Sequence, residues 1–67
     1  MKVGRYDRMK RALKEQLEIS DNVMRLLLRF LEQNKGTLSK RAREQEFSQF
    51  SAEECAQIEA LYAEIFT

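Results

Sequence analysis

The single thiol of the chain, Cys55, is the first residue whose type could support catalysis. A catalytic cysteine needs a nearby base that converts its thiol into a thiolate, and the sequence contains no histidine. Cys55 also falls on the apolar stripe of a predicted helix, where a small packed side chain is typical. We therefore interpret Cys55 as a core residue and not as a nucleophile.

A pair of carboxylates, Glu53 and Glu54, could act in acid–base chemistry or in metal binding. Their position directly after Ser51 indicates a different role, because acidic residues in the first turn of a helix stabilise its positive end. The sequence contains no calcium-binding loop and no glycine-rich phosphate loop. We expect a protein that is not an enzyme, has no catalytic or metal-binding residues, needs no cofactor and binds no small molecule.

The basic residues Lys40, Arg41 and Arg43 could contact the phosphates of a nucleic acid. They follow a predicted tight turn, so this part of the chain has the outline of a helix-turn-helix. Arg8 and Arg11, in the basic N-terminal segment, would add further phosphate contacts. The net charge is only +1, however, and the acidic last helix would repel a duplex. Nucleic-acid binding is therefore the alternative function.

Charge is distributed unevenly along the chain. Residues 1–14 carry six basic side chains and one acidic side chain, whereas residues 47–67 carry four acidic side chains and no basic one. This pattern predicts either two solvated helix faces that attract each other, within one copy or between copies, or a basic arm for an anionic partner. The basic segment has only Tyr6, Met9 and Leu13 on its apolar face, which is too thin for membrane binding.

The clearest predicted element is a helix over residues 52–66. Ser51 and Glu54 have the spacing of a capping box, in which each side chain accepts a hydrogen bond from the backbone N–H of the other residue. Apolar residues then recur every three or four positions, which predicts one buried stripe. The stripe consists of Cys55, Ile58, Leu61, Tyr62, Ile65 and Phe66.

Two further helices are predicted before it. The segment 23–34 is apolar around most of its circumference, which indicates burial on several sides, and Gly36 is a suitable stop for it. An earlier helix is separated from it by a break near Ser20, which begins a run of N-cap residues. The alternative is one helix over residues 5–34, a rod that would imply a dimer.

A short helix over residues 39–47 completes the predicted fold. The fold class is therefore all-α, a small bundle of three to four short helices with a helix-turn-helix-like central part. We expect a single helical domain over residues 1–67, with residues 1–4 disordered. No segment is long and apolar enough for a membrane span. A lone cysteine is typical of a reducing compartment, so we expect a cytoplasmic protein.

Apolar residues are more numerous than a monomer of 67 residues is expected to bury. A second copy or a larger partner would cover the excess. We therefore expect a protein-interaction or oligomerisation module, present as a homodimer, whose partner is another protein or a second copy of itself. The residues expected to make this contact are Leu28, Phe30, Tyr62 and Phe66.

A longer pattern covers much of the C-terminal part. The stretch from Phe30 to Phe47, followed by an acidic capped helix that ends Leu61-Tyr62-Ala63-Glu64-Ile65-Phe66, resembles the helical tail found after the catalytic domain in some Fic-family proteins. The active-site signature of that family, a histidine followed by a glycine- and asparagine-containing phosphate loop, is absent. The resemblance therefore implies an accessory or regulatory tail, or a freestanding relative of one, without adenylyl-transfer activity.

Overall fold

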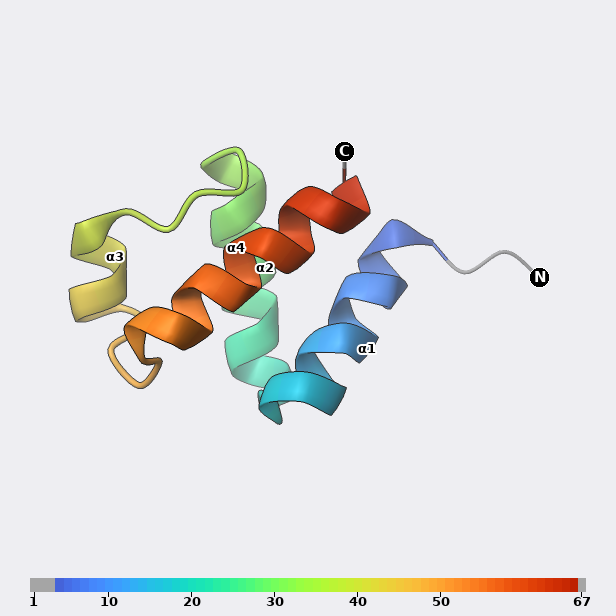
Figure 1. Cartoon of the computed structure of the whole chain (residues 1–67), viewed down its shortest axis with the longest axis horizontal. Helices are drawn as coiled ribbons and strands as arrows, with labels where there is room; N and C mark the ends of the chain where they lie inside the picture. Colours follow the sequence, from blue (N-terminus) through green and yellow to red (C-terminus); the bar gives the residue numbers. More distant parts are fainter. Residues whose placement is uncertain (1–3, 67) are drawn as a thin grey trace.

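Residues 4–66, the part of the chain that the computed structural model describes, form four α-helices and no strand. The all-α fold predicted from the sequence is therefore confirmed. Of the residues expected to be disordered, 1–3 lie outside the described part, and Gly4 is the N-cap of the first helix. The helices, shown in chain order in Figure 1, are α1 (Arg5–Leu17), α2 (Asp21–Gln33), α3 (Lys40–Gln45) and α4 (Ala52–Phe66).

The break between α1 and α2 is made by local backbone chemistry. Glu18 adopts the left-handed conformation at φ 53°, and its N–H donates to the carbonyl of Lys14, which closes the last turn of α1. The hydroxyl of Ser20 accepts from the N–H of Val23 at 3.5 Å, which caps α2. The prediction of a break near residue 20 is confirmed, and the alternative of one helix over residues 5–34 is wrong.

A tight turn after α2 sets the position of the next segment. Lys35 and Gly36 both have positive φ, at 54° and 82°, and the N–H of Gly36 donates to the carbonyl of Leu31 at 2.7 Å. A Cβ atom on Gly36 would lie 2.7 Å from the ring of Tyr62 on α4. Glycine is needed here for two reasons, the left-handed backbone and the close approach of an aromatic ring.

The third helix is shorter than the predicted range of 39–47. Ser39 caps α3 by accepting from the N–H of Ala42 at 3.2 Å. The helix ends at Gln45, and the N–H groups of both Glu46 and Phe47 then donate to the carbonyl of Ala42. Phe47 is 2% exposed, so the chain leaves the helix where this ring turns into the core.

The capping box at the start of α4 is confirmed. The N–H of Ser51 donates to Oε1 of Glu54 at 2.8 Å, and the N–H of Glu54 donates to the hydroxyl of Ser51 at 3.1 Å. The helix that follows has the bounds predicted from the sequence. Its start is therefore determined by residues that are three positions apart.

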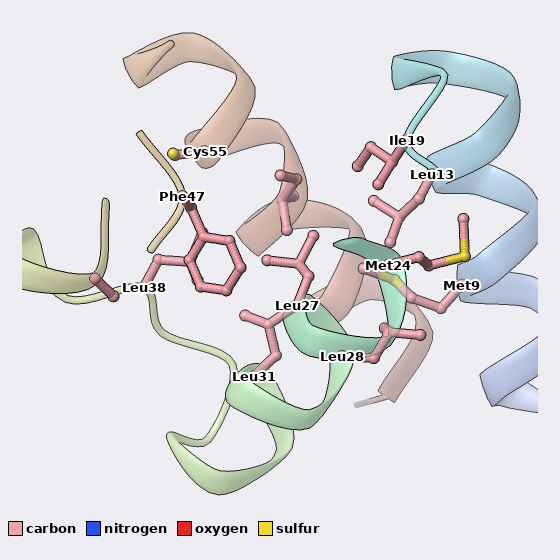
Figure 2. Packing of buried hydrophobic residues seen from close by; sticks show 12 residues of the cluster. Met9, Leu13, Ile19, Met24, Leu27, Leu28, Leu31, Leu38, Phe47 and Cys55 are labelled. Atoms are coloured by element: carbon pink, nitrogen blue, oxygen red, sulfur yellow. The ribbon is translucent and has the colours of Figure 1, made fainter. Parts of the chain in front are cut away.

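One hydrophobic cluster holds the four helices together. Figure 2 shows the ring of Phe47 pointing toward Leu27 and Leu31 of α2. Loop residues fill the cluster as well as helical ones, and eight further apolar residues are partly buried against it. Among the large apolar side chains of residues 4–66, those exposed are Tyr6 and Leu26. The buried residues are Met9, Leu13, Ile19, Met24, Leu27, Leu28, Leu31, Leu38, Ala42, Phe47, Cys55 and Ile58.

The helices are arranged so that α1 and α3 lie at opposite ends of the long axis. In Figure 1, α4 runs diagonally between them, and α2 lies behind α4. The most extensive helix–helix contact is that of α1 with α4. At this contact the side-chain amide of Gln57 donates a 2.6 Å hydrogen bond to Oε1 of Gln16. The basic side chains of α1 and those of α3 are therefore held apart.

Candidate functional site

The most exposed large apolar side chain of the described residues is Leu26, on the outer face of α2. It is 62% exposed, and Tyr6 of α1 follows at 44%. Both residues line one open hollow of about 660 Å³ between α1 and α2. An isolated exposed leucine is ordinary on a protein surface, but here it shares a concave site with an exposed aromatic ring. The remaining lining residues are Asn22, Arg25, Arg29 and Glu32.

A second hollow lies on the other side of Leu26. It shares Leu26 and Arg29 with the first, and it is also lined by Phe30, Gln33, Glu46 and Phe47. The rings of Phe30 and Phe47 meet edge to face, with centroids 5.6 Å apart and an angle of 77°. This arrangement is a favourable one for aromatic pairs and places a rigid apolar wall beside Leu26.

A third hollow continues the first in the opposite direction. It shares Tyr6 and Glu32 with the first hollow and is completed by Leu28, Tyr62 and Phe66. The rings of Tyr62 and Phe66 are stacked, with centroids 4.4 Å apart. Since each neighbouring pair of hollows shares two residues, the three adjoin one another in a band around the outer side of α2. We call this band, formed by the residues that line the three hollows, the α2 groove.

The centre of the α2 groove carries two unpaired cations. Arg25 and Arg29 lie one turn apart and are exposed. Among residues 4–66 the one ion pair within 4.0 Å joins Lys40 and Glu44 on α3, so neither arginine is paired with a carboxylate. The site therefore combines an apolar side chain, aromatic walls and positive charge that no carboxylate of the described residues neutralises.

The four predicted interface residues lie in two different hollows. Leu28, Tyr62 and Phe66 come together in the third hollow, whereas Phe30 lines the second. Leu28 is only 2% exposed and belongs to the core cluster, so it offers almost no surface for a contact. Its expected role is corrected on this ground, because α1 and α4 cover the side of α2 on which Leu28 lies.

Sequence reasoning missed Leu26 and Tyr6 as interface candidates. The sequence does contain a pattern that indicates exposure of Leu26. Arg25 and Arg29, one turn apart, mark the solvent-exposed side of α2, and Leu26 directly follows Arg25. Adjacent residues in a helix are rotated by about 100° around its axis. A leucine next to a solvent-exposed arginine therefore lies at the border of the apolar face. Because most residues around Leu26 are also apolar, the sequence pattern did not distinguish it from the core residues of α2.

The five basic residues proposed for nucleic-acid contact do not form one surface. All five are exposed. Lys40, Arg41 and Arg43 are on α3, and Arg8 and Arg11 are on α1, at the opposite end of the molecule (Figure 1). The second helix of the predicted helix-turn-helix-like part, α3, has only six residues. A duplex bound by the basic residues of α3 would therefore not be contacted on the same face by the basic residues of α1.

The thiol of Cys55 is held in a buried environment. The residue is 1% exposed. Burial raises the pKa of the Cys55 thiol, Arg43 lowers it, and the carboxylates of Glu59 and Glu54 raise it further. A thiol whose pKa is raised stays protonated and is a poor nucleophile. No group of three histidine, cysteine or acidic residues within 4–66 could hold a metal ion.

Comparison with known proteins adds no relative from which a function could be transferred. No protein-family model matches the chain, and the searches of curated proteins and of solved structures find no match. None of the helices within residues 4–66 combines the length and the apolar character that crossing a membrane requires.

Proposed function

We propose that this chain is a non-catalytic helical module that binds an amphipathic helix of another protein in the α2 groove. The observation that carries the proposal is the exposure of Leu26, 62%, in a fold whose other large apolar side chains, within the described residues, are buried or half-buried except for Tyr6. Leu26 stands between two hollows that share it. A partner that fills both hollows covers this leucine from both sides.

The shape of the site favours a helix as the occupant. The residues of α2 that line the groove span Asn22 to Gln33, which is roughly three turns at a rise of about 1.5 Å per residue. Aromatic walls stand on both sides of α2, Phe30 and Phe47 in one hollow and Tyr62 and Phe66 in another. Apolar residues at helical spacing on a partner would enter successive hollows.

A second copy of the chain is a less suitable occupant, although a homodimer was expected from the sequence. Tyr6 and Leu26 are the exposed large apolar side chains of the described residues, and both lie in the groove. Two copies could pair these side chains only by bringing their grooves together, which would also place Arg25 and Arg29 of one copy near those of the other. Like charges in contact oppose association.

On the resemblance of residues 30–66 to the helical tails of some Fic-family proteins, we further propose an accessory or regulatory role. A tail without chemistry of its own acts by contact with another polypeptide. The α2 groove supplies a surface for such a contact, and it includes residues of α4 as well as α2.

Nucleic-acid binding through Lys40, Arg41 and Arg43 is the alternative outcome. These residues lie outside the three hollows of the groove, so a variant at each place separates the two functions. Loss of a bound partner with Arg41→Glu and not with Leu26→Glu would favour the alternative.

A photo-crosslinking residue placed at position 26 tests the proposed function in the full chain. A matched crosslinker at Ala60, which is exposed on α4 and outside the groove, is the control. The protein captured only from position 26 is then purified, and its binding is titrated. We expect Leu26→Glu to abolish binding and Ala60→Glu to leave it unchanged. Equal affinity of both variants, or a product that is a covalent pair of this chain, would overturn the proposal.

A further inference from the structure

The charges of the α2 groove restrict the kind of helix that fits it. Arg25 and Arg29 are exposed on α2 and, together with Leu26, line a hollow that contains one carboxylate, Glu32. Arg29 also lines the second hollow, in which the carboxylate is Glu46. The ammonium group of Lys10 lies 5.6 Å from the centre of the Tyr6 ring, at the α1 side of the same hollow. The first hollow therefore carries two guanidinium groups against one carboxylate, which is an excess of positive charge.

We infer that the partner helix is acidic, with two carboxylate side chains one turn apart on either side of an apolar residue that contacts Leu26. The acidic partner presupposes the proposed function, since it assigns a charge pattern to the helix that the groove binds. Residues four apart on one helix are about 6 Å apart along its axis, and the same spacing separates Arg25 from Arg29. Two carboxylates with this spacing meet both guanidinium groups at once.

The chemistry of the two cations favours carboxylates in this place. A guanidinium group presents a planar set of N–H donors that matches the two oxygens of a carboxylate. Neither Arg25 nor Arg29 is within 4.0 Å of a carboxylate of the described chain, so no existing ion pair has to be broken before the partner binds.

Glu32 restricts where along α2 the acidic pair of the partner helix can lie. It lies three residues after Arg29 and is shared by the first and third hollows. A carboxylate of the partner near Glu32 would be repelled, so the acidic pair must lie toward the N-terminal part of α2. The helix therefore carries its acidic pair at one end of the contact and a neutral or basic residue at the other.

A nucleic acid is disfavoured in the same place. Phosphates would also pair with Arg25 and Arg29, but the polar backbone of the nucleic acid would then cover the apolar side chain of Leu26 beside them. Glu32 would then face the phosphates of the same strand. Duplex DNA binding that depends on these two arginines would therefore contradict the acidic partner.

Three synthetic amphipathic helices, identical except at the two charged positions, test the acidic partner. The positions carry glutamate, glutamine or lysine, and each peptide is titrated against the full chain by fluorescence anisotropy. Because two partly exposed ion pairs are gained, we expect the glutamate peptide to bind about tenfold more tightly than the glutamine peptide, and the lysine peptide more weakly than both. At about 0.5 M salt this preference should largely disappear.

The double variant Arg25→Gln, Arg29→Gln should lose the preference, and its circular dichroism should match that of the unchanged chain. The matched control is Arg41→Gln, Arg43→Gln, which removes the same charge from α3 and should keep the preference. Equal affinity for the glutamate and glutamine peptides would overturn the acidic partner and leave the proposed function standing. Failure of all three peptides to bind would overturn both. Duplex DNA binding that depends on Arg25 and Arg29 would replace the acidic helix with a nucleic acid.

Discussion

The backbone N–H of Leu38 donates a 2.7 Å hydrogen bond to Oε2 of Glu59, which is 21 positions later in the chain. Leu38 belongs to the turn between α2 and α3, and Glu59 lies in the middle of α4. This bond joins the central turn to the last helix at a partly buried position. It supplies an acceptor to an N–H group that precedes the first turn of α3 and has no helical partner.

Replacement of Glu59 should therefore destabilise the fold. In Glu59→Ala the Leu38 N–H loses its acceptor, and we expect the free energy of unfolding to fall by about 1–2 kcal/mol in urea titrations. Glu59→Gln retains a carbonyl acceptor and should lose less. Glu64→Ala, at an exposed position on the same helix, is the control and should stay within about 0.5 kcal/mol of the unchanged chain. Equal effects of the two alanine variants would contradict this account.

The turn at Gly36 should not tolerate any side chain. Its φ is 82°, and a Cβ atom would lie 2.7 Å from Cδ1 of Tyr62. We expect Gly36→Ala to lower the melting temperature by roughly 5–15 °C, because about 1–2 kcal/mol of strain corresponds to such a shift in a chain of this size. Gly4→Ala is the matched control, since no atom lies within 4 Å of a Cβ placed there. A melting temperature for Gly36→Ala equal to that of the control would show that the ring moves away freely.

Leu26 and Leu27, adjacent in α2, should respond to truncation in opposite ways. Leu27 is fully buried, so we expect Leu27→Ala to destabilise the fold by about 2–5 kcal/mol through lost packing and an internal cavity. Leu26 is mostly exposed, and Leu26→Ala should change the free energy of unfolding by less than about 0.5 kcal/mol. Chemical denaturation of both variants measures the difference. Similar losses would mean that Leu26 is packed and is unavailable to a partner.

The raised pKa of the Cys55 thiol predicts a loss of stability at alkaline pH. In the unfolded chain the thiol ionises near its ordinary pKa of 9.0, whereas burial in the folded chain holds the proton to higher pH. Between these two pKa values the unfolded state binds fewer protons, so the free energy of unfolding falls as the pH rises. The contribution is fully present below pH 9.0 and is lost as the pH passes through the raised pKa.

Unfolding of the unchanged chain and of Cys55→Ala as a function of pH tests this linkage. All other ionisable side chains are common to both proteins. The difference between the two curves therefore isolates the thiol. We expect the unchanged chain to lose stability more steeply above pH 9.0 than the variant. Parallel curves would contradict the burial of the thiol.

Local interactions explain why much of the fold is predictable from the sequence. Ser51 and Glu54 cap α4 through residues only three positions apart. Glu18 ends α1 and Ser20 begins α2 through contacts that are as short in sequence. Such interactions need no information from distant parts of the chain. Helix α3 was predicted too long, because its end depends on Phe47 turning into a cluster built by other helices.

The sequence by itself determined the helices, their caps, the glycine turn and the uneven distribution of charge, because these depend on residue types and short spacings. Only the tertiary structure decided that Leu28 is buried while Leu26 faces outward, that Tyr6 joins Leu26 in one groove, and that the basic groups of α1 and α3 lie apart. The physical reason is that an apolar run in α2 offers several faces for burial. The angles at which α1, α3 and α4 pack against it select which face remains in water.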